Sequence, residues 1–76
     1  MAEELVMPRL SDTMEEGTII EWLAGEGEAV AAGDDLLEVQ TDKAAATYAA
    51  EEAGVLRIRE PAGRTVPVGT VIAELA

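Results

Sequence analysis

The sequence predicts an all-β domain, a sandwich or barrel of about eight short strands. Short apolar runs alternate with stretches that contain glycine or proline, at the spacing of strands joined by tight turns. The pattern G-x-x-V-x-x-G occurs twice, at residues 27–33 and 63–69, with an apolar run before and after each copy. Because 76 residues suffice for one small domain, the repeat indicates two similar halves of a single domain, residues 1–76.

Four apolar segments are expected to form the strands of the first half. Residues 5–7 predict the opening strand, and the run after Gly17 predicts a second strand over residues 18–23. A short segment around Val30 follows, and residues 36–41 predict the last strand of this half.

The second half repeats this plan. Residues 55–58 predict a strand, a short segment lies around Val66, and residues 71–75 predict the closing strand. Pro67 lacks a backbone N–H and lies in the short segment, so this segment should be at the edge of a sheet.

Several residues are expected to have structural roles only. Glycine reaches positive φ at little cost, which predicts turn positions at Gly17, Gly33, Gly54 and Gly69. The two aromatic residues, Trp22 and Tyr48, are expected to pack against the core rather than to bind a ligand.

Residues 42–53, "DKAAATYAAEEA", leave two alternatives open. Alanine and glutamate favour a helix, and Thr41 could cap its N-terminus. The repeat favours a hairpin, with residues 44–50 as a strand that returns along residues 36–41. We predict the strand, because tertiary context often overrides propensity.

The composition excludes several function classes. A net charge of −11 argues against nucleic acids and anionic membranes as partners, since both need a basic patch. Without cysteine or histidine the chain lacks the usual zinc ligands and the commonest general base, and Ser11, the single serine, has no base near it in sequence. We therefore expect no catalytic residues and no metal site.

The acidic start "MAEELVMPRL" is unlike a signal or transit peptide, and no apolar run approaches the length of a membrane span. We expect a soluble intracellular protein, or one domain of a longer intracellular protein. The acids are spread along the chain, which indicates a solvated surface or a surface that attracts basic partners.

Lys43 is the only lysine among 16 acids and four arginines. In the predicted hairpin, Asp42 and Lys43 form the tip, where Asn-Gly or Asp-Gly would be usual. Three small residues follow, Ala44, Ala45 and Ala46, and they leave room for an enzyme or an attached group. A Schiff-base role needs burial or a cationic neighbour, which this turn does not offer. We predict an amine presented for covalent modification; the alternative is a charged residue at a solvated tip.

Over nearly its whole length the chain resembles the lipoyl domain of the dihydrolipoamide acyltransferase (E2) component of 2-oxo acid dehydrogenase complexes. "TDKA", residues 41–44, is similar to the family's lipoylation signature, whereas related biotinyl domains carry methionine on both sides of the lysine. "MPRLSDTMEEGTIIEW", residues 7–22, resembles the opening of the pyruvate dehydrogenase type. The alanine-rich "AAATYAA" departs from the more β-branched strand that is common in the family.

The resemblance implies a flattened barrel-sandwich hybrid of two four-stranded antiparallel sheets with quasi-twofold symmetry, the biotinyl/lipoyl domain fold, with the lysine hairpin at one end. It implies lipoate in amide linkage to Lys43, with Asp42 and Ala44 as a flanking recognition motif. It also implies a surface loop near the lysine that takes part in E1 recognition, made of Ser11, Asp12, Thr13, Met14, Glu15, Glu16 and Gly17.

The implied function is that of a swinging-arm acyl carrier, a domain without its own active site inside a longer acyltransferase, most similar to an acetyltransferase. Its partners would be the thiamine-diphosphate-dependent dehydrogenase (E1), which acylates the arm, the E2 core, which passes the acyl group to coenzyme A, dihydrolipoyl dehydrogenase (E3), and a lipoyl ligase or transferase. The isolated domain would be monomeric, in a bacterial cytoplasm or a mitochondrial matrix. A biotin carrier and an unmodified interaction module of the same fold remain alternatives.

Overall fold

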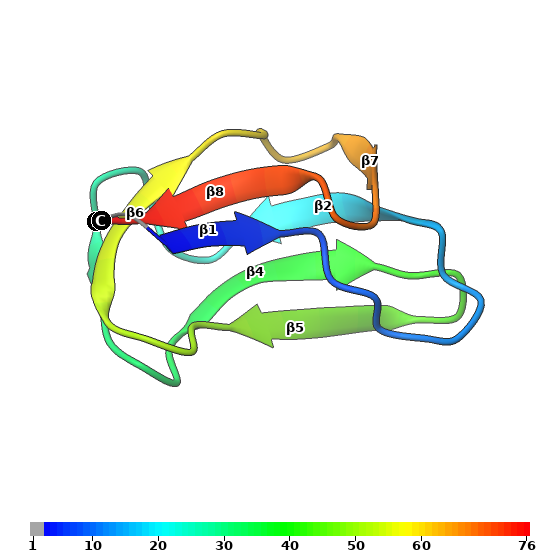
Figure 1. Cartoon of the computed structure of the whole chain (residues 1–76), viewed down its shortest axis with the longest axis horizontal. Helices are drawn as coiled ribbons and strands as arrows, with labels where there is room; N and C mark the ends of the chain where they lie inside the picture. Colours follow the sequence, from blue (N-terminus) through cyan, green and yellow to red (C-terminus); the bar gives the residue numbers. More distant parts are fainter. Residues whose placement is uncertain (1–2) are drawn as a thin grey trace.

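A computed structural model describes residues 3–76, which form two four-stranded antiparallel sheets (Figure 1). The strand order is β1-β8-β6-β3 in one sheet and β5-β4-β2-β7 in the other. The strands are β1 (Glu3–Val6), β2 (Glu16–Trp22), β3 (Ala29–Val30), β4 (Asp35–Gln40), β5 (Ala45–Ala49), β6 (Gly54–Ile58), β7 (Thr65–Pro67) and β8 (Val71–Leu75). No strand pairing joins the two sheets within the described residues, so the molecule is a flattened sandwich and not a closed barrel. The predicted fold class is confirmed.

The internal repeat appears as a correspondence between the two sheets. β2 and β4 lie at the centre of one sheet, and β6 and β8 occupy the same places in the other. Each half turns at a glycine with positive φ, 93° at both Gly33 and Gly69. β7 is an edge strand, as Pro67 predicted. The opening strand begins at Glu3, ahead of the predicted residues 5–7, because Glu3 and Glu4 already pair with β8.

The prediction of turn positions at Gly17 and Gly54 is wrong. Both glycines lie in strands, in β2 and at the start of β6, and neither has a positive φ. A Cβ on Gly17 would lie 2.7 Å from the buried ends of Met7 and Met14, and one on Gly54 would lie 3.1 Å from the carbonyl oxygen of Ala76. Close packing, not backbone conformation, therefore favours glycine at these two positions.

The alanine-rich segment forms strand β5, and the helical alternative is not realised. β5 pairs with β4 in the register Leu37↔Tyr48 and Val39↔Ala46. The side chains of Tyr48 and Ala46 are half-buried, while Thr47 between them is exposed. Pairing along a central strand thus supplies the backbone hydrogen bonds that a helix would have made internally, and it outweighs a helix preference of a few tenths of a kcal/mol per residue.

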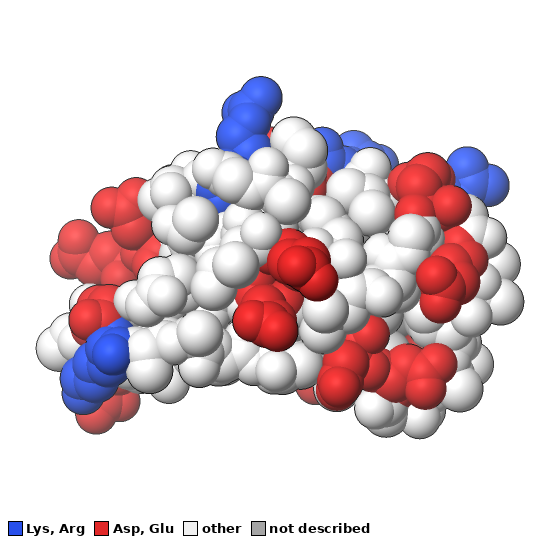
Figure 2. Space-filling view, turned by 180° about the vertical axis from the view of Figure 1, so that it is seen from behind, with Lys and Arg blue, Asp and Glu red and all other residues white. Residues whose placement is uncertain are grey.

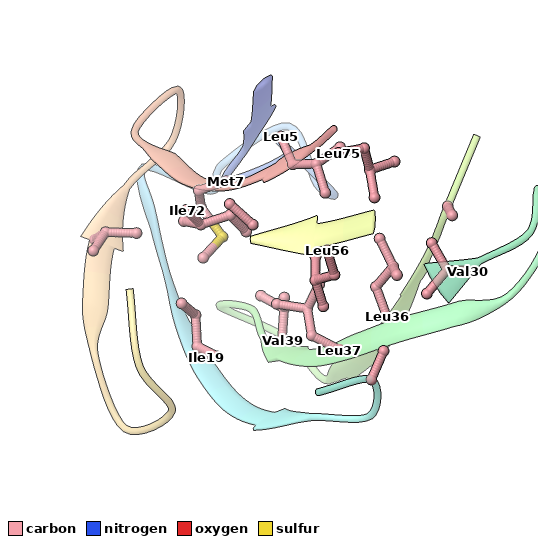
Figure 3. Close-up of a cluster of buried hydrophobic side chains, with 14 of the residues drawn as sticks. Leu5, Met7, Ile19, Val30, Leu36, Leu37, Val39, Leu56, Ile72 and Leu75 are labelled. Atoms are coloured by element: carbon pink, nitrogen blue, oxygen red, sulfur yellow. The ribbon is translucent and has the colours of Figure 1, made fainter. Parts of the chain in front are cut away.

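The core lies between the sheets, and Figure 3 shows side chains from both sheets pointing into it. Trp22 and Tyr48 pack against this core as predicted, and the Trp22 indole N–H donates to the carbonyl oxygen of Glu60 at 2.9 Å. The buried apolar residues are Leu5, Met7, Met14, Ile19, Ala24, Val30, Leu36, Leu37, Val39, Ala50, Leu56, Val66, Ile72, Ala73 and Leu75.

The two ends of the sandwich differ in what they carry. The turn between β4 and β5 lies at one end, whereas the start of β1 and the C-terminus lie at the other (Figure 1). Acidic side chains are spread across the face seen in Figure 2 and do not gather in one patch. Within residues 3–76 we find no helix of the length and apolarity that crossing a membrane requires.

Candidate functional site

The turn between β4 and β5 presents Lys43 as the sequence predicted. Thr41 and Ala44 face each other across the hairpin, and the Thr41 amide donates to the Ala44 carbonyl oxygen at 2.9 Å. Asp42 and Lys43 are the two residues of the tip, and both are exposed. The next residues, Ala44 and Ala45, are exposed too, so no large side chain of this strand shields the amine.

The Thr41 hydroxyl organises the backbone of this turn. Its oxygen accepts the amide N–H groups of Lys43 at 3.1 Å and of Ala44 at 3.0 Å. The hydroxyl itself donates to the Ala44 carbonyl oxygen at 2.7 Å. A hydroxyl has one donor and two acceptor sites, so all three are used within a single turn.

Asp42 joins the turn to a loop that is distant in sequence. One carboxylate oxygen accepts the Ser11 hydroxyl at 2.7 Å, and the other accepts the Thr13 hydroxyl. Two hydrogen bonds hold the pKa of Asp42 below its ordinary value: the bond from the Thr13 hydroxyl has the largest effect, and the bond from the Ser11 hydroxyl the next largest. The carboxylate therefore remains charged at neutral pH and keeps both hydrogen bonds.

The loop between β1 and β2 is fixed from within as well. The Met14 side chain is completely buried, its sulfur accepts the Leu10 amide at 3.3 Å, and its carbonyl oxygen accepts the Arg9 guanidinium at 2.7 Å. At the far end of the loop, the Val68 amide donates to the Glu15 carbonyl oxygen at 2.9 Å. Met14 thus anchors in the core the loop that carries Ser11 and Thr13 at its surface.

The predicted surface loop over residues 11–17 needs correction in part. Met14 and Gly17 are buried, and Glu16 and Gly17 already belong to β2. The exposed or half-exposed part of the loop comprises Ser11, Asp12, Thr13 and Glu15. Packing explains the difference, because the Met14 side chain is buried against Gly17.

A polar groove of about 430 Å³ adjoins the turn. It runs between the loop and the ends of β2 and β4, and its lining contains no lysine or arginine. The lining residues are Thr13, Glu15, Glu16, Gly17, Thr18, Gln40, Thr41, Asp42 and Thr65. In residues 3–76 no group of three or more histidine, cysteine, aspartate or glutamate side chains is placed to hold a metal ion.

The structure brings most of the predicted site residues together. Asp42 and Lys43 form the tip with Ala44 directly after it, and Ser11 and Thr13 contact Asp42 directly. The role of the Thr41 hydroxyl was missed, since the sequence suggested Thr41 as the cap of a helix and as the first residue of the "TDKA" motif, with no contact to the turn backbone. A threonine directly before a two-residue tip is a signal that could have revealed it, because its hydroxyl can bond to the backbone two residues on.

Comparison with known families identifies the family of this chain. The family model Biotin_lipoyl, described as "Biotin-requiring enzyme", matches residues 3–75. The chain belongs to this family. The two four-stranded sheets are those of the Biotin_lipoyl fold, and the family name covers both lipoyl and biotinyl domains.

Known relatives of this Biotin_lipoyl domain include components of 2-oxo acid dehydrogenase complexes. It is 47% identical over 78 residues to the "Dihydrolipoyllysine-residue acetyltransferase component of pyruvate dehydrogenase complex" of Zymomonas mobilis, covering 100% of this chain and 18% of that protein. It is 46% identical over 72 residues to the mouse "Pyruvate dehydrogenase protein X component, mitochondrial", covering 92% and 14%. A third relative is the "Dihydrolipoyllysine-residue succinyltransferase component of 2-oxoglutarate dehydrogenase complex" of Bacillus subtilis, at 40% over 74 residues, covering 96% and 18%.

These relatives confirm the resemblance to E2 lipoyl domains of the pyruvate dehydrogenase type, and they support a carrier role. The chain spans less than a fifth of the length of each curated relative named above. The mouse relative is named as a mitochondrial protein, and the Zymomonas mobilis relative comes from a bacterium.

Proposed function

We propose that this domain carries lipoate in amide linkage to Lys43 and serves as the mobile acyl carrier of a 2-oxo acid dehydrogenase complex. The observation that carries the proposal is the exposed lysine at the tip of a two-residue turn, followed by two exposed alanines. The turn has room for a modifying enzyme and for a long attached group. When bound, lipoate supplies a cyclic disulfide that takes up an acyl group with two electrons and releases the acyl group to a thiol acceptor.

The residues of the chain contribute position and not chemistry. Lys43 supplies the amine for one amide bond, and Asp42 and Ala44 form the motif that the lipoylating enzyme reads. The loop residues Ser11 and Thr13 lie next to this motif through Asp42. A group tethered at one end of a rigid sandwich reaches successive active sites at high effective concentration, without release of the intermediate.

The partners that fit this role are the E1 dehydrogenase, the E2 acyltransferase core, the E3 dihydrolipoyl dehydrogenase and a lipoyl ligase or transferase. The names of two relatives favour a pyruvate dehydrogenase complex, and the name of the Zymomonas mobilis relative favours an acetyltransferase as the parent chain. The location would be the cytoplasm of a bacterium or the matrix of a mitochondrion. A biotin carrier is the competing function within the family, and the absence of methionine on either side of Lys43 argues against it.

Co-expression with a lipoyl ligase tests the proposal. The intact mass of the domain should rise by the mass of one lipoyl group in amide linkage, and the modified peptide should contain Lys43. A matched control moves the amine: in Lys43→Arg combined with Arg57→Lys, the only lysine lies on the exposed side of β6. This variant should fold and remain unmodified. A wild-type chain that stays unmodified while a control lipoyl domain is lipoylated would refute the proposal, and a streptavidin blot tests for biotin.

A further inference from the structure

The turn that carries Lys43 does not use the geometry usual for its length. Two-residue hairpin tips normally adopt type I′ or II′ turns, which need positive φ at one or both tip residues. Within residues 3–76 no residue other than glycine has a positive φ, so Asp42 and Lys43 both have ordinary negative values. The tip therefore avoids the cost that a side chain bears in the left-handed region. Besides the hydrogen bond from the Thr41 amide to the Ala44 carbonyl oxygen at 2.9 Å, a second interaction closes it.

The Thr41 hydroxyl is that interaction. In a regular hydrogen-bonded pair of an antiparallel ladder, the Ala44 amide would donate to the Thr41 carbonyl oxygen. Here the Ala44 amide donates to the Thr41 hydroxyl oxygen at 3.0 Å. The same oxygen accepts the amide of Lys43 at 3.1 Å, and the Thr41 carbonyl oxygen accepts the Gln40 side-chain amide at 3.2 Å instead. The hydroxyl thus holds the backbone of the modified lysine itself.

We propose that Thr41 is a positioning residue for the modification of Lys43, an inference that rests on the proposed function. Modification requires the Lys43 Nζ to attack the carboxyl carbon of an activated lipoyl acyl donor; the N–C bond forms as the activating group leaves and the nitrogen releases a proton. A ligase aligns the donor, and the backbone of the turn sets the position from which the Lys43 side chain and its amine extend. By fixing the Lys43 amide, the Thr41 hydroxyl limits the positions that the amine can take.

Three variants separate this role from a general effect on the fold. Thr41→Val keeps the shape of the side chain and removes the hydroxyl, and Thr41→Ser restores the hydroxyl without the methyl group. Thr47→Val is the matched control, since Thr47 is exposed on β5 and has no hydrogen bond to the turn among the described residues. For each variant, kcat and KM of a purified lipoyl ligase are measured with the domain as substrate, and thermal unfolding reports the fold.

We expect Thr41→Val to lower kcat on the order of tenfold, because a misplaced nucleophile lowers the rate of the chemical step. KM should change less, since the sandwich and the exposed motif remain. Thr41→Ser and Thr47→Val should both stay within about twofold of wild type, on the same reasoning. Amide hydrogen exchange at Lys43 and Ala44 should speed up in Thr41→Val alone, which tests the turn independently of the ligase.

Each other outcome has a definite meaning. Wild-type kcat in Thr41→Val would overturn the inference, as would a Thr41→Ser variant as slow as Thr41→Val. If kcat of Thr41→Val falls only in proportion to the unfolded fraction of the protein, Thr41 contributes to stability alone, and the positioning role is overturned. A wild-type domain that the ligase leaves unmodified would instead refute the proposed function, and the inference with it.

Discussion

Replacing Met14 by alanine should destabilise the whole domain, although Met14 lies in a loop and not in a strand. Its side chain is completely buried beside Met7 and Gly17. Removal of a buried methionine costs about 2–5 kcal/mol of unfolding free energy, the sum of lost burial and a residual cavity. A chain of 76 residues has a total stability of roughly 4–11 kcal/mol. Met14→Ala should therefore remove on the order of half of it.

Urea unfolding measures this loss, with the fluorescence of Trp22 as the probe. Trp22 is the single tryptophan and packs against the core, so its emission reports the sandwich and not the loop alone. Met14→Leu is the control, because a change that keeps the volume should cost less than about 1.5 kcal/mol.

The two variants together decide whether the loop belongs to the core. A loss below about 1 kcal/mol in Met14→Ala would lie under the range for a buried methionine. It would show that the loop detaches without disturbing the sheets, which would refute the role of Met14 as an anchor.

Three further predictions concern the same end of the molecule. Gly17→Ala should cost about 1–3 kcal/mol in urea unfolding, because its Cβ would overpack the buried methionine ends; an unchanged midpoint would contradict this. Ser11→Ala with Thr13→Val should slow acylation by E1 while lipoylation by the ligase stays near wild type; equal losses in both assays would contradict a loop role specific to E1. The pKa of Asp42 is lowered in the folded state, so its hydrogen bonds add stability that is present above its unfolded pKa and is lost as the pH falls through the folded pKa. Carboxyl titration by NMR should show the pKa of Asp42 rising in the double variant, and no change would contradict the assigned cause.

Much of the fold could be predicted because the repeat and the apolar runs act locally. The glycine pattern of residues 27–33 and 63–69 predicts two similar halves, and Pro67 predicts an edge strand. Residues 44–50 show where local preference fails. Their alanines favour a helix, and only pairing with β4 makes them a strand.

What the sequence did not reveal depends on contacts between distant residues or on packing. The bond from Ser11 to Asp42 spans 31 residues, and no local pattern connects the two. Gly17 and Gly54 appeared to be turn glycines, because a glycine required by a close neighbour looks the same in sequence as one required by φ. Thr41 is the exception, because its hydroxyl acts on the adjacent turn and a threonine directly before a two-residue tip is a sequence signal for such bonds.

A tryptic peptide map of the protein from its native host tests the central claim most directly. Between Arg9 and Arg57, Lys43 is the only site for trypsin, and a lysine in amide linkage resists cleavage. Lipoylation predicts one uncut peptide, residues 10–57, whose mass includes a single lipoyl group. Cleavage into residues 10–43 and 44–57, in cells whose other lipoyl domains are modified, would contradict the claim, as would a biotinyl mass on the uncut peptide.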